Sequence, residues 1–106
     1  MSSSQRRFEI LLPQRYNDGQ PVPDELIADA LLAIRQKFKS VSSETQIIRG
    51  IWEHAGISYR DELIRIFVDV DDLQENHQFF RDFKEQLKVT FRQVDIRITT
   101  YLIEVY

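Results

Sequence analysis

The apolar residues of this chain change their spacing from segment to segment, and this change restricts the possible folds more than any other feature. Residues 7–12 alternate between apolar and polar side chains around Glu9. A period of two recurs, with a rise in β-branched and aromatic residues, in residues 45–54, 57–70 and 95–106. Such alternation predicts four half-buried β-strands, the middle two joined as a hairpin.

Two further segments have the spacing of amphipathic helices. The first begins at Pro23, which suits a first helical turn, and runs to about Lys39. Its apolar face carries Leu26, Ile27, Ala30, Leu31, Ile34 and Phe38. The second helix is expected after Asp72, with Asp71 or Asp72 as its cap. Its apolar face carries Phe79, Phe80, Phe83, Leu87 and Phe91.

The order β-α-β-β-α-β is typical of the split βαβ, or ferredoxin-like, arrangement. We therefore predict an α+β fold with a four-stranded antiparallel sheet, strand order 4-1-3-2, and two helices on one face. The first and third strands are expected to be parallel central neighbours joined by a right-handed crossover. A single ferredoxin-like domain would span residues 7–106, after a disordered N-terminus at residues 1–6.

The amino-acid composition limits the classes of protein to which this chain can belong. The chain has 106 residues, of which 42% are hydrophobic and 29% charged, as expected for one soluble domain. It has no cysteine, no signal-peptide pattern and no apolar run near the roughly 20 residues that span a bilayer. We therefore expect a cytoplasmic protein with no membrane partner. The net charge of −3 argues against a nucleic-acid partner, because phosphate binding requires a basic face.

Alternation also assigns the two faces of the sheet. The more uniformly apolar set is expected to face the helices; it comprises Phe8, Ile10, Leu12, Ile64, Ile66, Val68 and Val70. The open face would mix arginines with apolar and aromatic side chains. Its interface candidates are Leu11, Arg49, Leu63, Arg65, Phe67 and Tyr101. Such a face is unusual in a monomer, so we expect a homo-oligomer formed through it. The alternative is a solvated sheet on which Glu9, Arg49 and Arg65 pair across strands.

Residues 50–62 form the densest group of chemically active side chains. This segment supplies an aromatic platform and groups for proton transfer, namely Trp52, His54, Tyr59, Arg60 and Asp61. The simpler interpretation is that Trp52 and Tyr59 form an ordinary cross-strand pair. Neither the two histidines nor the acidic run at residues 69–72 has the spacing of a metal site, so we expect no metal and no cofactor.

The segment between the first strand and the first helix, residues 13–23, combines prolines with an Asn-Asp-Gly turn. Gly19 is free to take a positive φ there. In the predicted topology this loop would lie beside residues 69–72, where Arg15 would pair with Asp69 or Asp71. We interpret it as a rigid loop that leads into the helix. The ligand-binding candidates are Arg15, Tyr16 and Asn17 in this loop, together with Trp52 and Tyr59.

Two short motifs carry a resemblance to a known family. They consist of Asp18, Gly19, Pro21 and Val22, followed by Gly50, Trp52 and Gly56. This pair resembles a family of small uncharacterised bacterial proteins that have a D-G-x-P-V segment followed by a G-x-W…G hairpin. The similarity extends from about residue 8 to residue 105. It implies the same α+β fold and carries no established activity.

Three functions remain open at this point. The leading hypothesis is a small interaction or regulatory domain that self-associates through the open sheet face and has room for a small-molecule ligand. The first alternative is a cofactor-independent enzyme of the dimeric α+β barrel type. The second is a metabolite- or nucleotide-sensing domain in which the loop at residues 13–23 would hold the ligand.

Overall fold

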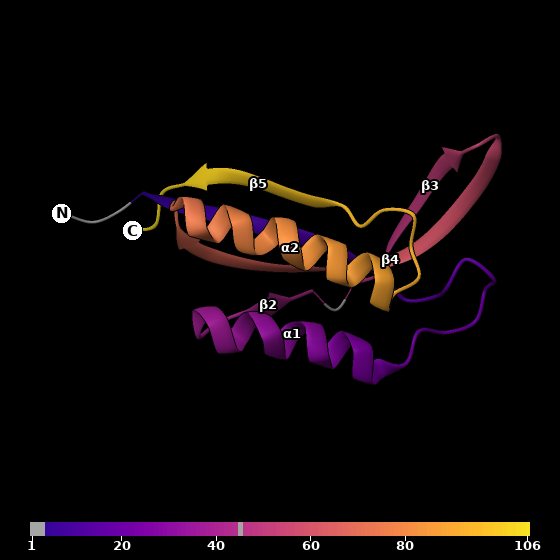
Figure 1. Ribbon diagram of the computed structural model, residues 1–106, viewed down its shortest axis with the longest axis horizontal. Coiled ribbons are helices and arrows are strands. Elements are labelled where there is room, and N and C mark those ends of the chain that lie inside the picture. Colours follow the sequence, from indigo (N-terminus) through magenta and orange to yellow (C-terminus); the bar gives the residue numbers. More distant parts are fainter. Residues whose placement is uncertain (1–3, 45) are drawn as a thin grey trace.

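The computed structural model describes residues 4–44 and 46–106 and has an α+β fold in which both helices cover one face of an antiparallel sheet (Figure 1). The elements in chain order are β1 (Gln5–Pro13), α1 (Asp24–Phe38), β2 (Ser42–Ser43), β3 (Ile48–His54), β4 (Ile57–Asp71), α2 (Gln74–Thr90) and β5 (Ile98–Ile103). The predicted fold class and both helices are confirmed. β1 begins two residues earlier than predicted, so Gln5 and Arg6 are strand residues. The disorder expected at residues 1–3 lies outside the described residues.

The sheet has five strands instead of the predicted four. β1 and β4 are central, β5 pairs with β1, and both β2 and β3 pair with β4. The segment predicted as one strand at residues 45–54 therefore supplies only β3, while Ser42–Ser43 forms a separate short strand. The reason is the length of β4, which has 15 residues. A strand of that length extends about 50 Å, and two short strands share its edge.

β1 and β4 are antiparallel, with Gln5 opposite Asp71 and Pro13 opposite Leu63. The predicted parallel pairing of the first and third strands is therefore wrong. The crossover through α1 brings the chain back parallel to β1, and the hairpin turn after β3 then reverses it. As a consequence, the loop at residues 13–23 lies beside Leu63, and the acidic run at residues 69–72 lies at the far end of the sheet.

The turn between β3 and β4 has two residues. His54 pairs with Ile57, and the intervening Ala55 and Gly56 take φ values of 52° and 78°. Positive φ at both positions is what a type I′ turn requires, and this turn matches the twist of the flanking strands. The hairpin it closes projects away from the rest of the molecule (Figure 1).

The core lies between the helices and the face of the sheet predicted from alternation. In the centre, Phe8, Ile66 and Val68 are at most 3% exposed. The ring of Phe80 from α2 stacks on Phe8 at 4.0 Å between ring centroids and on Phe38 from α1 at 5.5 Å. These aromatic contacts join both helices to β1. The predicted assignment of this face is confirmed.

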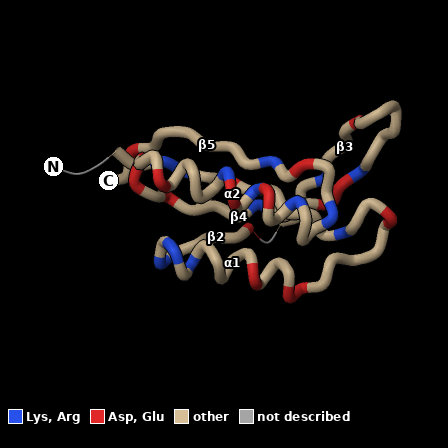
Figure 2. Tube along the Cα trace, viewed as in Figure 1, with Lys and Arg blue, Asp and Glu red and all other residues tan. Residues whose placement is uncertain are grey.

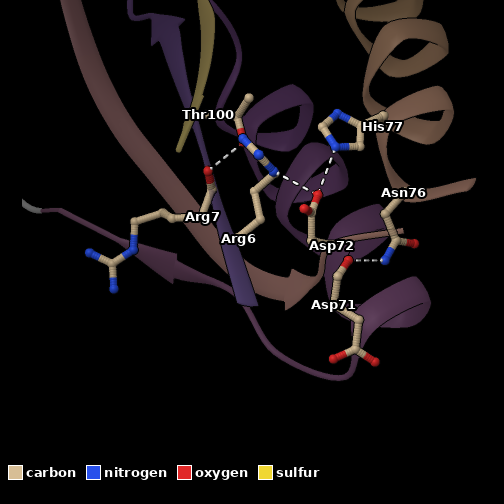
Figure 3. A network of polar contacts seen from close by, with 7 residues as sticks. All are labelled: Arg6, Arg7, Asp71, Asp72, Asn76, His77 and Thr100. Atoms are coloured by element: carbon tan, nitrogen blue, oxygen red, sulfur yellow. Dashed lines mark hydrogen bonds and ion pairs between the residues drawn. The ribbon is translucent and has the colours of Figure 1, made fainter. Parts of the chain in front are cut away.

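A polar network ties the start of α2 to β1 (Figure 3). Arg6 Nε donates to Asp72 Oδ1 at 2.8 Å, and His77 Nε2 lies 2.9 Å from the same oxygen. The buried Asn76 side chain donates to the backbone carbonyl of Asp71 at 2.8 Å. The predicted cap is wrong, because the helix follows Leu73 without a side-chain capping hydrogen bond. The Asp72 carboxylate instead forms hydrogen bonds with the side chains of Arg6 and His77.

This network makes stability depend on pH. Hydrogen bonds from Arg6 and then His77 lower the pKa of Asp72 below its ordinary value. A carboxyl whose pKa is lower in the folded state contributes stability above its unfolded pKa, and this contribution is lost as the pH falls through the folded pKa. We expect Asp72→Asn to unfold at lower urea than the native chain at pH 6. The difference should shrink progressively below about pH 4. The exposed Asp29→Asn on α1 is the control, and a difference for Asp72→Asn that stays constant down to pH 2 would contradict the assignment.

Candidate functional site

A cavity of about 390 Å³ opens on the uncovered face of the sheet, where the β3–β4 hairpin meets the segment that leads into β5. Its lining includes Leu11, Ile48, Trp52, Asp61, Leu63 and Arg97. Gly50 adds no side chain to this surface, and a Cβ built there would lie 3.6 Å from a methyl group of Leu63. The cavity is therefore mostly apolar, with charged groups at only a few points.

One wall of the cavity is aromatic. Trp52 and Tyr59 face each other across the hairpin, with ring centroids 4.4 Å apart and ring planes at 17°. The predicted cross-strand pair is therefore confirmed. Indole Nε1 of Trp52 donates to the carboxylate of Asp61, two residues along β4 from Tyr59. Stacking and this hydrogen bond together hold the indole ring in one orientation at the cavity wall.

Asp61 is the polar group closest to this wall. It is half-buried, and Oδ2 accepts the hydrogen bond from Trp52. Its other oxygen accepts no hydrogen bond from residues 4–44 or 46–106. A ligand N–H or O–H is the complementary partner for such an oxygen. On the opposite side of the cavity, Arg97 offers an exposed guanidinium, and Asp95 is paired with Lys84 at 3.0 Å.

The rest of the open face is covered by a network of paired charges. Arg7 binds Asp69 through two hydrogen bonds of 2.7 and 3.0 Å, and its guanidinium lies 4.6 Å from the centroid of the Phe67 ring. The bond to Asp69 raises the pKa of Arg7. This paired arginine packs flat on the sheet and stays charged.

Glu9 is the centre of a second part of the same network. It lies 3.9 Å from Arg65 and accepts a hydrogen bond of 2.7 Å from the hydroxyl of Tyr101. That hydrogen bond raises the pKa of Tyr101 above its ordinary value. The predicted cross-strand pairing of Glu9 with Arg65 is confirmed. Arg49 takes no part in it, because β3 places Arg49 on the opposite face, across from Glu62.

The predicted interface candidates thus fall into three places. Leu11 and Leu63 line the cavity, while Arg65, Phe67 and Tyr101 lie on the open face beyond it. Arg49 lies on the reverse side of the hairpin. Sequence reasoning placed Arg49 on the open face with Arg65, and the pairing of Arg49 with Glu62 shows that it lies on the other side.

The loop at residues 13–23 is held by its own hydrogen bonds and by β4. Gln14 N donates to the carbonyl of Glu62 at 2.8 Å, and Arg15 forms an isolated bridge with Pro21. Gly19 takes a φ of 88°, as the turn chemistry predicts. These contacts favour the structural interpretation of the loop.

The three ligand-binding candidates in this loop do not reach the cavity. Arg15 lies 3.7 Å from Glu62, so the predicted pairing with Asp69 or Asp71 is wrong. The antiparallel direction of β4 places those carboxylates at the other end of the sheet. Tyr16 packs against the core beneath the guanidinium of Arg92, at 4.6 Å from the ring centroid, and Asn17 is exposed. Of the five candidates, only Trp52 lines the cavity, and Tyr59 stacks on it.

Sequence reasoning missed the contribution of the segment that leads into β5. Gln93, Asp95 and Ile96 line the cavity, although they lie more than 30 positions after Asp61 in the chain. The available signal was the alternation of the last strand, which places Arg97 on the same face as Tyr101. It did not reveal that this segment crosses the base of the hairpin.

Within the described ranges no three His, Asp or Glu side chains gather as ligands for an ion. None of the helices formed by these residues is long and apolar enough to cross a membrane.

Comparisons with known proteins give a likeness in structure only. No family model and no curated protein matches the chain. Among solved structures, a phage SAM lyase in complex with S-methyl-5'-thioadenosine is similar, with a TM-score of 0.73. A phage SAM lyase in the apo state gives a TM-score of 0.67. Each alignment covers 100% of this chain and 90% of the other, at 14% identity. The fold is therefore shared over the whole chain.

Proposed function

We propose that this chain is a small, cofactor-independent enzyme that binds S-adenosylmethionine (SAM) in the cavity beside Trp52 and breaks a carbon–sulfur bond of the bound molecule. The observation that carries the proposal is the cavity itself, with its stacked aromatic wall and the partly unpaired carboxylate of Asp61. Its volume of about 390 Å³ lies in the range of small-molecule sites. The shared fold with a SAM lyase indicates which ligand class to consider first.

The cavity offers a partner for each part of SAM. The adenine ring can stack on the exposed side of the Trp52 indole, since stacking on an aromatic ring suits any base. The free oxygen of Asp61 can accept a hydrogen bond from the adenine amino group or a ribose hydroxyl. The sulfonium cation is attracted to aromatic faces, and the guanidinium of Arg97 matches the α-carboxylate.

The chemistry follows from the two small molecules. S-methyl-5'-thioadenosine keeps the adenosine, sulfur and methyl group of SAM and lacks its four-carbon amino-acid portion. Forming it breaks the bond between sulfur and that portion. The electron pair of this bond stays on sulfur, which becomes a neutral thioether. The α-carboxylate of the same molecule supplies the new bond to the carbon that loses sulfur, so the four-carbon fragment leaves as a lactone and no proton is transferred. Because the positive charge on sulfur disappears, an apolar cavity that excludes water favours the transition state over the bound substrate.

The direct test is to incubate the purified protein with SAM and to measure S-methyl-5'-thioadenosine by chromatography. A parallel thermal-shift titration with S-methyl-5'-thioadenosine measures binding. At a ligand concentration of 100 times Kd, we expect a stabilisation of about 2.7 kcal/mol, which is a shift of several degrees in Tm. Binding without product would favour the metabolite-sensing alternative. Neither binding nor product at millimolar ligand would contradict the proposal.

A second candidate function is self-association through the open sheet face. It is favoured by the absence of any described element over this face, where Phe67 and Tyr101 lie among paired arginines. Aromatic side chains and arginine are enriched at protein–protein interfaces. The two candidates are compatible, since the cavity opens on the same face as the proposed interface.

Phe67→Asp tests this association. The new carboxylate would lie opposite Glu9, so we expect it to convert a homo-oligomer into a monomer at tens of micromolar protein. Light scattering coupled to size exclusion measures the mass. Val89→Asp, at a position on α2 that is 80% exposed, is the control for added charge and should leave the mass unchanged. A native chain that is already monomeric at this concentration would exclude the interface.

A further inference from the structure

A second hollow lies on the reverse side of the hairpin from the cavity beside Trp52, and the two linings share Gly50, Ile51 and Asp61. It has a volume of about 390 Å³ and is lined by Arg15, Arg49, Arg60 and Glu62, among others. We call it the arginine hollow. Alternation along the strands explains the separation, because Arg49 pairs with Glu62 and Arg60 with Ile51, while Trp52 and Asp61 point to the other side. Figure 2 shows positive residues along the projecting hairpin and in the adjoining loop, with acidic residues beside them.

The charges in the arginine hollow are unbalanced. Three arginines line it from the loop, β3 and β4, and its lining has two carboxylates, those of Asp61 and Glu62. Of these, Asp61 bonds to Trp52 on the opposite face. Arg49 and Arg60 form no ion pair with residues 4–44 or 46–106. The arginine hollow therefore has a local excess of positive charge, although the net charge of the whole chain is −3.

One of the three arginines is already held in place. Arg15 Nη1 donates to the carbonyl of Gly19 at 3.1 Å, and Arg15 Nε lies 3.7 Å from Glu62. The backbone on both sides of Arg15 is fixed by the bridge to Pro21 and by the bond from Gln14 to Glu62. A ligand would therefore need to order only Arg49 and Arg60, which lowers the entropic cost of binding.

We propose that the arginine hollow binds a phosphoryl group, either as free phosphate or as the phosphate of a small phosphorylated molecule. Guanidinium groups donate paired N–H bonds that match the oxygens of phosphate. A phosphoryl group presents at least three oxygens in different directions, so it can engage arginines that arrive from three segments. A carboxylate has two oxygens in one plane and cannot satisfy all three. The bound dianion also removes the repulsion among the arginines.

The test is a titration of the ¹⁵N-labelled protein with inorganic phosphate at pH 7.5 and constant ionic strength, followed through the arginine Nε–Hε resonances. We expect saturable shifts for Arg15, Arg49 and Arg60 and none for the Trp52 indole. Acetate should give a weaker response at the same concentration. A parallel titration with glycerol 3-phosphate distinguishes the sources. Equal affinity indicates that the phosphoryl group alone is recognised, and tighter binding indicates a phosphorylated molecule.

The double variant Arg49→Gln and Arg60→Gln should bind phosphate at least about tenfold more weakly, the loss expected for one charged hydrogen bond. The matched control replaces the exposed helix residues Arg35 and Arg81 with glutamine and should keep the native affinity. Linear shifts without saturation, equal shifts with chloride, or native affinity in the double variant would overturn the proposal. Trp52→Ala should leave phosphate binding unchanged, so this test is independent of the function proposed for the cavity.

Discussion

Replacing Trp52 with alanine is expected to reduce strongly both the thermal stabilisation of the protein by S-methyl-5'-thioadenosine and the release of this product from SAM. The indole ring forms the aromatic wall of the cavity, and its hydrogen bond orients Asp61. Stacking of a base on an aromatic ring contributes about 1–3 kcal/mol, and loss of the Asp61 orientation adds to this effect. We therefore expect the affinity to fall by about tenfold to a hundredfold or more. The measurement is the thermal-shift titration, repeated with the product assay.

Two further variants separate stacking from hydrogen bonding. Trp52→Phe keeps an aromatic face and removes the bond to Asp61, so it should retain part of the binding. Val89→Ala changes a residue of α2 that is 80% exposed and outside the cavity lining, and it should bind like the native chain. If Trp52→Ala keeps the full thermal shift, then the cavity is not the binding site, whatever the chain does with SAM.

Replacing Phe80 with alanine is expected to lower the free energy of unfolding by about 3–5 kcal/mol, because it removes a large buried ring and leaves a cavity. Phe80 is 2% exposed and stacks on Phe8 and Phe38, so its ring links α2, β1 and α1. The free energy of unfolding of a domain of this size is roughly 5–15 kcal/mol in total, so the variant would lose a large share of its stability. Urea denaturation followed by circular dichroism measures the change.

Controls on the same helix make this result specific. Val89 is 80% exposed near the end of α2, so Val89→Ala should change stability by no more than about 0.5 kcal/mol. Phe80→Leu keeps much of the buried volume, so it should lower the free energy of unfolding by less than Phe80→Ala does. A loss below about 1 kcal/mol for Phe80→Ala would show that the helices do not depend on this aromatic contact.

Much of the fold follows from local patterns in the sequence. The alternation around Phe8 and Ile66 correctly assigned the buried face of the sheet, and the helical spacing of Phe80 and Phe83 correctly placed the second helix. Gly56 correctly marked the hairpin turn. Each of these features depends on residues within a few positions of one another, where the period of the backbone decides which side chains share a face.

The site was predictable only in part. The pairing of Trp52 with Tyr59 follows from a short hairpin, so sequence reasoning found the aromatic wall. It did not find the side chains that complete the cavity, such as Asp95, because nothing local shows that their segment crosses the base of the hairpin. It also placed Arg49 on the wrong face, because local sequence does not fix the register of β3, and the observed pairing with Glu62 puts Arg49 on the reverse side.

The sequence by itself determined the periods of the strands and helices, the buried face and the hairpin, because these are properties of neighbouring residues. Only the tertiary structure decided that β4 runs antiparallel to β1. This direction determines which end of β4 lies beside each end of β1. Gln5 and Asp71 are 66 positions apart, and their pairing depends on the path of the intervening chain. That path brings Arg15 to Glu62 and away from Asp69. It also places the aromatic cavity and the arginine hollow on opposite sides of one hairpin.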